Sequence, residues 1–272
     1  MFERLPSSNR MTVFTLLELI YHSTVREIRK THSNALVGLL LNILQTVLLV
    51  IAFYFMFVLI GIRTSPVRGD FLLYIMSGIF IFVVHIKAMG AVLSADGPSS
   101  AMMKHAPMNT FVAIVAAALG SLYIQVLSVF IVLLIYHIVF TPITIYDPAG
   151  AMGMLLLAWF TGCSIGVLLL ALKPWAPDLV GIVAAVYMRV NMIASGKMFL
   201  VNTLPANIIA MFDWNPLFHT IDQTRGYVFI NYNPHFTNIE YPIYFGIAFL
   251  VLGLMGEFYT RKAASLSWEA KR

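Results

Sequence analysis

Long apolar runs alternate with short polar connections along almost the whole chain. Six runs are long enough to cross a bilayer, at 35–62, 71–91, 111–136, 152–172, 179–199 and 241–259. About 20 apolar residues span the hydrocarbon core as a helix, and these runs lack the apolar–polar alternation of membrane barrel strands. We therefore expect an all-α membrane protein with six transmembrane helices, in a single transmembrane domain over residues 1–272.

The segment before the first run has a helical period instead of a continuous apolar character. Apolar residues such as Phe14 and Leu17 share one half of a helical wheel over 12–33, and Glu18 and Arg26 occupy the other half. This pattern predicts a helix that lies in the membrane interface with its apolar side toward the lipid. Packing on a soluble domain is the alternative interpretation.

The connection between the second and third runs contains "SADGPSSAMMKHAPMN". Pro98 suits the first position of a helix, and Pro107 would end that helix. The sequence predicts a short cytoplasmic helix over 98–105, with a plain connecting turn as the alternative.

The segment between the fifth and sixth runs is too polar for a span and too apolar for an ordinary loop. Its prolines predict two short helices, at Pro205–Phe212 and Pro216–Tyr227. Twelve helical residues rise only about 18 Å, which is too short to cross a core of about 30 Å. We expect a re-entrant hairpin over 205–229 that enters from the periplasmic side. A helix lying flat on the membrane is the alternative.

The charged residues of this hairpin predict particular contacts and orientations. Asp222 and Arg225 lie three residues apart on one helix face, a spacing that predicts an ion pair. His219 and Arg225 are expected to face the exit of a conduit.

Composition also indicates a membrane protein, and the positions of the positive charges predict how the chain is oriented in the membrane. The chain is 60% hydrophobic and 11% charged, whereas soluble domains are roughly 25% charged. Of the 17 lysines and arginines, all but Arg63, Arg68, Arg189, Lys197 and Arg225 fall on the side of the two termini. Positive residues concentrate on the cytoplasmic side, so both termini are expected there, which requires an even number of spans.

Polar and small residues inside the spans favour particular helix faces. Asn42 and Gln45 share a face of the first span, and Gly162 and Gly166 form a small-xxx-small pair in the fourth. Helix packing is one interpretation of such residues, and the wall of a substrate pathway is the other. Arg189 and Lys197 in the fifth span are cations in an expensive environment and therefore candidates for function. A purely structural role is the alternative.

The sequence contains few groups that could perform chemistry. Gly196-Lys197 lacks the remainder of a nucleotide-binding loop, the seven histidines are scattered, and Cys163 is the only cysteine. Glu257 is the only carboxylate within a span, four residues before Arg261, so a local ion pair is its expected role. We expect no catalytic site, no metal site and no cofactor in this chain.

Four segments in order resemble the permease subunits of type-two ATP-binding-cassette exporters, and most closely those that export bacterial capsular polysaccharide and O-antigen. They are "REIRKTHSNALVGLLLNIL" (26–44), "KHAPMNTFVAIVAAAL" (104–119), "WNPLFHTIDQTRGYVF" (214–229) and "FYTRKAASL" (258–266). The resemblance implies a homodimer in the bacterial inner membrane, joined to two copies of a separate ATPase that binds ATP and Mg. It also implies a lipid-linked glycan as substrate and no nucleic acid.

Pattern and resemblance together suggest three groups of site residues. The ATPase-coupling group comprises Pro98, Met102, Met103, Lys104, His105 and Pro107. The substrate conduit comprises Asn42, Gln45, Arg189 and Lys197, and the periplasmic gate comprises Trp214, Asn215, Pro216, His219, Asp222 and Arg225. Met102 and Met103 are the expected apolar anchors, because methionine suits a contact that re-packs.

Other functions remain open at this level. One is a permease for another bulky lipid-linked molecule or a drug, and another is a membrane-embedded enzyme that modifies a glycan or lipid. A secondary carrier is disfavoured, because such carriers usually need an intramembrane carboxylate or a broken helix at midplane.

Overall fold

A computed structural model describes residues 13–30, 35–61, 65–96 and 110–269. Throughout these ranges the regular structure is helical, and six of the helices are long and apolar enough to cross a membrane. The expected all-α fold with six candidate spans is confirmed. The helices are α1 (Val13–Lys30), α2 (Ala35–Leu59), α3 (Phe71–Leu93), α5 (Thr110–Val139), α6 (Pro148–Leu172), α7 (Pro177–Ala194), the 3-10 turn η1 (Val201–Thr203), α8 (Ala206–Phe212), α9 (Pro216–Val228) and α10 (Glu240–Glu269).

The helix ends differ from the predicted spans mainly at α7 and α10. The helix α7 ends at Ala194 rather than at residue 199, because Gly196 adopts a φ of 76°, a left-handed conformation that stops a helix. The helix α10 continues to Glu269, well past the predicted end at residue 259. Arg189 consequently lies close to one end of α7, but Tyr187, two residues before it, contacts His85 in the middle part of α3.

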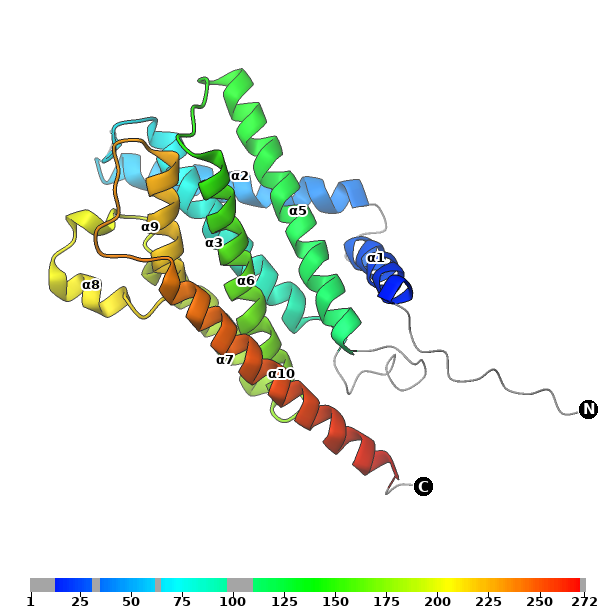
Figure 1. The fold of residues 1–272 in the computed structure, drawn as a ribbon. Helices are drawn as coiled ribbons and strands as arrows, with labels where there is room; N and C mark the ends of the chain where they lie inside the picture. The colour runs from blue at the N-terminus through cyan, green and yellow to red at the C-terminus, as the bar shows by residue number, and fades with distance from the viewer. Residues whose placement is uncertain (1–12, 31–34, 62–64, 97–109, 270–272) are drawn as a thin grey trace, which may run out of the picture.

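The helices α3 and α6 form the centre of the bundle. Most residues of both are buried, and α6 packs against α3 on one side and α10 on the other (Figure 1). A Cβ atom at Gly162 would lie 2.4 Å from the backbone oxygen of His85, and one at Gly166 would lie 2.8 Å from that of Met89. The small-xxx-small pair therefore lets two backbones approach closely, as its packing interpretation predicts.

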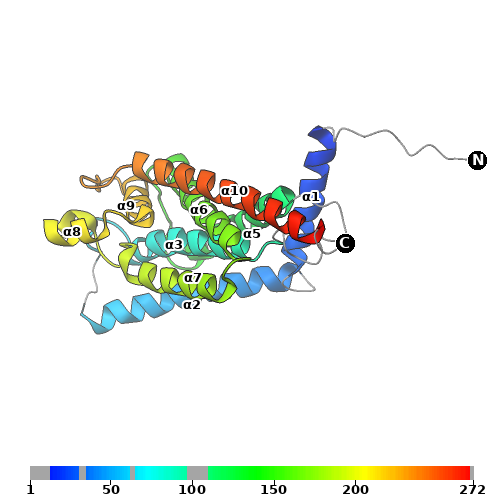
Figure 2. The ribbon, with the colours of Figure 1, turned by 90° about the horizontal axis from the view of Figure 1, so that it is seen from below.

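The two ends of the bundle carry different structures. Figure 2 shows α8 and α9 at one end, which we call the hairpin end, and α1 across the other end, where α10 also ends. Val13, Phe14, Leu17 and Tyr21 of α1 are exposed, as expected for an interface helix, although its contact with a membrane stays a prediction.

Helix starts at the hairpin end are fixed by side chains that the sequence supplies locally. Asp70 accepts hydrogen bonds from the backbone N–H groups of Leu72 and Leu73, at 2.7 and 3.0 Å. Asp147 caps α6 in the same way, directly before Pro148. Caps of this kind satisfy the first N–H groups of a helix, and proline fits its first position.

Candidate functional site

The helix α9 is buried at the hairpin end of the bundle. It packs against α3 and α6 and, more lightly, against α10. Leu217 and Ile221 are fully buried on it. Its 13 residues rise about 20 Å, too little to cross a bilayer core. The two helices of the expected hairpin are thus present. The helix α9 is buried, as re-entrant backbone would require, whereas on α8 only Ile209 is buried, so a re-entrant position of the hairpin stays a prediction.

The turn between α8 and α9 is tied to α7. The Asn215 side chain accepts from the Leu217 N–H at 3.0 Å and so caps α9. Its amide nitrogen donates to the side-chain oxygen of Asn191 at 2.9 Å and to the Ala194 carbonyl at 3.0 Å. Pro216 follows the cap and is buried, whereas Trp214 remains 52% exposed at the tip of the hairpin. Of these residues, only Trp214 is positioned to face outward.

Arg225 does not face an exit. It is fully buried, and its guanidinium donates to the carbonyls of Gly196 at 3.0 Å, Phe199 at 2.6 Å and Lys197 at 2.7 Å. Its carbon Cζ lies 4.4 Å from the ring centre of Tyr74, within cation–π distance. The expectation is wrong because the chain unwinds after α7 and exposes three carbonyls, which the arginine satisfies. Arg225 thereby ties α9 to α3 and to the turn after α7.

Asp222 and Arg225 do not form the predicted ion pair. The Asp222 carboxylate accepts hydrogen bonds from the hydroxyls of Tyr232 and Thr237, the latter at 2.8 Å. Burial raises the pKa of Asp222, although these two hydrogen bonds and the nearby charges of Arg225 and His219 oppose the shift. The spacing along α9 was compatible with a pair, but stronger partners come from the loop that precedes α10.

His219 is also buried, with 3% of its surface exposed, and so does not face an exit. Its Nε2 lies 2.7 Å from the carbonyl of Asp213 and its Nδ1 accepts from the Asn238 N–H at 3.2 Å. Because a carbonyl only accepts, Nε2 carries a proton, and it also lies 3.1 Å from the Asp213 carboxylate oxygen Oδ1. His219 joins the tip of the hairpin to the loop before α10.

Lys197 is buried rather than directed to an open conduit. Only 2% of its surface is exposed, and its Nζ donates to the Met192 carbonyl and lies 3.8 Å from the ring centre of Phe82. The positive φ at Gly196 turns the chain inward, which explains why the side chain packs against α3.

Asn42 and Gln45 serve contacts inside the protomer. The Asn42 amide donates to the Ser128 hydroxyl at 2.8 Å and accepts from Gln125 at 3.0 Å, so it joins α2 to α5. Gln45 accepts from the Lys87 ammonium at 2.7 Å. These bonds support the packing interpretation, and a role in a conduit stays a prediction.

Arg189 differs from the other candidates because it is exposed in the protomer. Its helix contributes few residues to the core: Val180, Ala184, Asn191 and Ala194 are the buried ones in α7. The charge therefore lies on a helix face that this chain does not cover.

A polar contact inside the bundle was not anticipated from the sequence. His85 is fully buried on α3, with Nδ1 lying 3.0 Å from the Ala158 carbonyl and Nε2 lying 2.8 Å from the Tyr187 hydroxyl. Nδ1 must carry the proton toward the carbonyl, so the Tyr187 hydroxyl donates to Nε2. This contact and the Asn191–Asn215 bond attach α7 to the centre. In the sequence, the only sign of this contact was that His85 lies in a helix among residues expected to be buried.

Two further expectations concern residues 98–107 and the helix α10. The predicted coupling helix at 98–105, with Pro98, Met102, Met103, Lys104, His105 and the following Pro107, lies outside the described residues. Glu257 forms no ion pair with Arg261; its Oε1 is buried without a hydrogen-bond partner, and Arg261 lies over the ring of Phe258 instead. Among the described residues, no three histidine, cysteine, aspartate or glutamate side chains cluster as metal ligands.

Comparison with known proteins adds one finding. The family model described as "ABC-2 type transporter" matches residues 18–229, which is more than half of the chain and includes α2 to α9. A search of the curated proteins found no match.

Proposed function

The chain belongs to the ABC-2 type transporter family, and from this premise we propose that it exports a lipid-linked polysaccharide of the capsule or O-antigen type. As the transmembrane subunit of an ATP-driven exporter, it leaves ATP hydrolysis to a separate partner subunit. In this proposal two copies of the chain and two ATPase subunits form the exporter in a bacterial inner membrane. Both termini lie in the cytoplasm, and the substrate moves from there to the periplasm.

The exposed Arg189 carries the proposal of a conduit between two copies. A charge at mid-membrane depth is expensive against lipid. Tyr187, two residues before Arg189, contacts His85 in the middle part of α3, so the face of α7 that bears Arg189 needs a polar neighbour. A second copy of the chain that encloses water supplies one. Asn42 and Gln45 are occupied by contacts within the protomer, which favours a pathway between protomers over one through a single protomer.

Aromatic side chains on the outer faces support a glycan as substrate. Tyr54, Tyr123, Trp175, Tyr244 and Tyr259 are each more than a third exposed in the protomer. Tyrosine and tryptophan combine a flat apolar ring with a polar tip, a combination that suits the faces of sugar rings. Tyrosine and tryptophan also favour membrane interfaces, so transport itself must be measured.

Removal of this chain from its host provides that measurement. Lipid-linked glycan should then accumulate where a periplasmic glycosidase cannot reach it in intact spheroplasts, and become accessible after lysis. Complementation with the full chain should restore access in intact spheroplasts. Glycan that reaches the periplasm without this chain rules out the proposed function.

The hairpin is proposed as the periplasmic gate, with a division of labour among its residues. Trp214 and Asp213 at its tip are exposed and would face the conduit mouth. Asn215, Pro216, His219, Asp222 and Arg225 are buried and hold the hairpin in place.

Cysteine labelling tests the orientation of this gate. In a Cys163→Ala background, Asp213→Cys and Trp214→Cys should react with a membrane-impermeant maleimide added to intact spheroplasts, because both positions are exposed at the hairpin end. The matched control is Arg261→Cys at the other end, which should react only after lysis. The reverse pattern contradicts both the gate and the cytoplasmic termini.

Coupling to the ATPase is predicted to depend on Met103. We expect Met103→Asp to reduce export at least tenfold while ATP hydrolysis by the assembled complex continues, because a charge would disrupt an apolar contact worth roughly 1.4 kcal/mol or more. Met103→Leu is the conservative control. Wild-type export by Met103→Asp would exclude this contact.

Arg189 is predicted to act on the substrate rather than on folding. Arg189→Gln should lower export of an acidic glycan about tenfold, since a charge-assisted hydrogen bond contributes roughly 1.5–3 kcal/mol, and leave protein abundance unchanged. Arg189→Lys, which keeps the charge, should retain more export than Arg189→Gln. A collapse in the abundance of Arg189→Gln would instead assign the residue to folding or assembly.

A further inference from the structure

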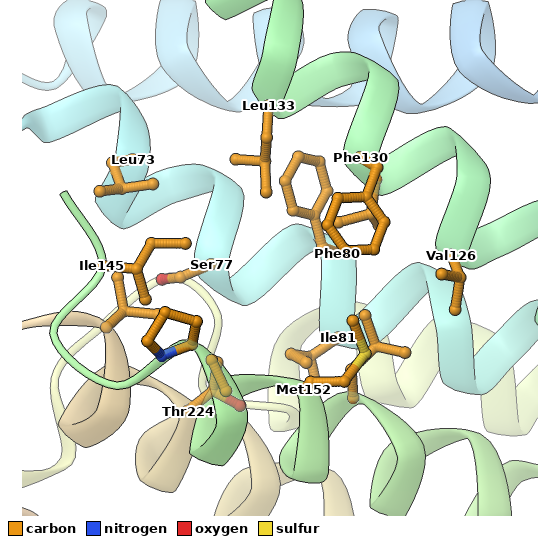
Figure 3. A pocket seen from close by; sticks show the side chains of 15 residues that line it. Leu73, Ser77, Phe80, Ile81, Val126, Phe130, Leu133, Ile145, Met152 and Thr224 are labelled. Atoms are coloured by element: carbon orange, nitrogen blue, oxygen red, sulfur yellow. The ribbon is translucent and has the colours of Figure 1, made fainter. Parts of the chain in front are cut away.

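An apolar crevice with a volume of about 130 Å³ runs between α3, α5, α6 and α9. Figure 3 shows side chains from these helices around it, with Phe80 and Phe130 on one side and Met152 and Thr224 on the other. Only two hydroxyls line it, and each is engaged within its own helix. Ser77 donates to the Tyr74 carbonyl at 2.8 Å, and Thr224 donates to the Thr220 carbonyl at 2.6 Å. The crevice therefore offers a hydrocarbon surface and no hydrogen-bonding group for a sugar.

A larger pocket with a volume of about 410 Å³ adjoins the crevice at the hairpin end. Leu73, Ile145 and Val228 line both spaces, so the two lie side by side at these three residues. Unlike the crevice, the larger pocket has two charged side chains in its wall, Arg68 and Asp70. Together the two spaces form an amphiphilic site with its polar part at the hairpin end.

The two charges in the polar pocket differ in how they are held. Partial burial opposes ionisation of Asp70, but hydrogen bonds from the N–H groups of Leu73 and Leu72 and the hydroxyls of Tyr136 and Thr141 outweigh it and lower its pKa. Arg68 is exposed, and no hydrogen bond or ion pair joins it to another described residue. A fixed anion and an available cation thus share one pocket.

We propose that these two adjoining spaces bind one phospholipid with a zwitterionic phosphoethanolamine headgroup. Part of one acyl chain occupies the crevice, the phosphate contacts Arg68, and the ammonium group lies toward Asp70. Along α3 the crevice extends from Leu73 to Ile81, a rise of about 12 Å, which directs the chain into the bundle from the leaflet on the hairpin side. The opposite charges match a zwitterion better than an anionic lipid, which Asp70 would repel.

Occupancy of this site bears on the hairpin. Thr224 and Val228 of α9 form part of the wall, so the acyl chain packs against the same helix that carries the hairpin. A bound lipid fills the space beside α9 and restrains its movement relative to α5 and α6.

Photolabelling of the full chain tests the site. The purified protein is placed in phosphatidylcholine nanodiscs that contain a small fraction of phosphatidylethanolamine with a diazirine in one acyl chain. We expect labelled peptides from α5 and α6, at Phe130 and Met152. Val126→Trp fills the crevice and should lower this labelling about tenfold, a change of about 1.4 kcal/mol, whereas Leu134→Trp, on the outer face of the same helix, should not.

The headgroup is tested by competition with unlabelled lipids. Arg68→Gln should weaken phosphatidylethanolamine binding about tenfold, because it removes a charge-assisted bond to phosphate. Asp70→Asn keeps a capping oxygen but loses the charge, and should let phosphatidylglycerol compete as well as phosphatidylethanolamine. Ala151→Leu on α6 narrows the crevice and substitutes for Val126→Trp if that variant does not fold.

Three results overturn the proposal. Labelling spread as heavily over α2, α7 and α10 as over the crevice indicates ordinary surrounding lipid. Labelling that persists in the crevice-filling variants excludes an acyl chain there. Equal competition by phosphatidylglycerol and phosphatidylethanolamine in the unmodified protein excludes recognition of the zwitterionic headgroup.

Discussion

Arg225→Met is expected to remove most of the folded protein from the membrane. The substitution leaves the carbonyls of Gly196, Lys197 and Phe199 without the donors that now satisfy them. Breaking a buried network by removing one partner costs about 3–5 kcal/mol, a large part of the stability of a typical domain. Protein abundance in membranes and the thermal unfolding midpoint in detergent measure the effect.

Two matched variants separate this role from a loss of charge alone. Arg225→Lys keeps the charge but offers a point ammonium in place of a planar fork of donors, so it should be intermediate. Arg261→Met removes an exposed arginine and should change stability by less than about 0.5 kcal/mol. An Arg225→Met protein as stable as the unmodified chain would mean that Arg225 does not hold the turn after α7.

Gly162→Ala is expected to have the second largest effect on stability. A Cβ atom at this position would lie 2.4 Å from the backbone oxygen of His85, and neither backbone can yield without moving α6 away from α3. Overpacking of a core typically costs 1–3 kcal/mol, and occasionally more. The thermal unfolding midpoint should fall, and the buried bond between His85 and Tyr187 should weaken with it.

Gly153→Ala is the control on the same helix, because nothing lies within 4 Å of its added Cβ. Alanine is the better helix former, so this variant should be neutral or more stable by up to about 1 kcal/mol. Equal behaviour of the two variants would show that α3 and α6 are farther apart than described.

The helices were predictable because their signals are local. Apolar length fixed the six candidate spans, and the prolines at 205 and 216 placed the two helices of the hairpin within one or two residues of Ala206–Phe212 and Pro216–Val228. A turn with positive φ at Gly196 leaves no such trace in the apolar pattern, so the end of α7 was placed too late.

The partners of the polar residues were not predictable, because they come from distant segments. Arg225 and Asp222 are correctly spaced for a pair on one helix, yet the arginine binds carbonyls more than 25 residues earlier and the carboxylate binds Tyr232 and Thr237. His85 and Tyr187 are 102 residues apart. Such partners are brought together by the packing of whole helices, and the spacing of residues along the sequence does not reveal them.

Reconstituted transport tests the central claim most directly. The chain is incorporated into proteoliposomes with the ATPase subunit that copurifies with it, and lipid-linked glycan is supplied on the ATPase side. The account predicts ATP-dependent appearance of glycan on the hairpin side, where an impermeant glycosidase releases it, and no appearance when ATP is replaced by a non-hydrolysable analogue. Glycan that remains on the ATPase side during sustained ATP hydrolysis by the intact complex would contradict it.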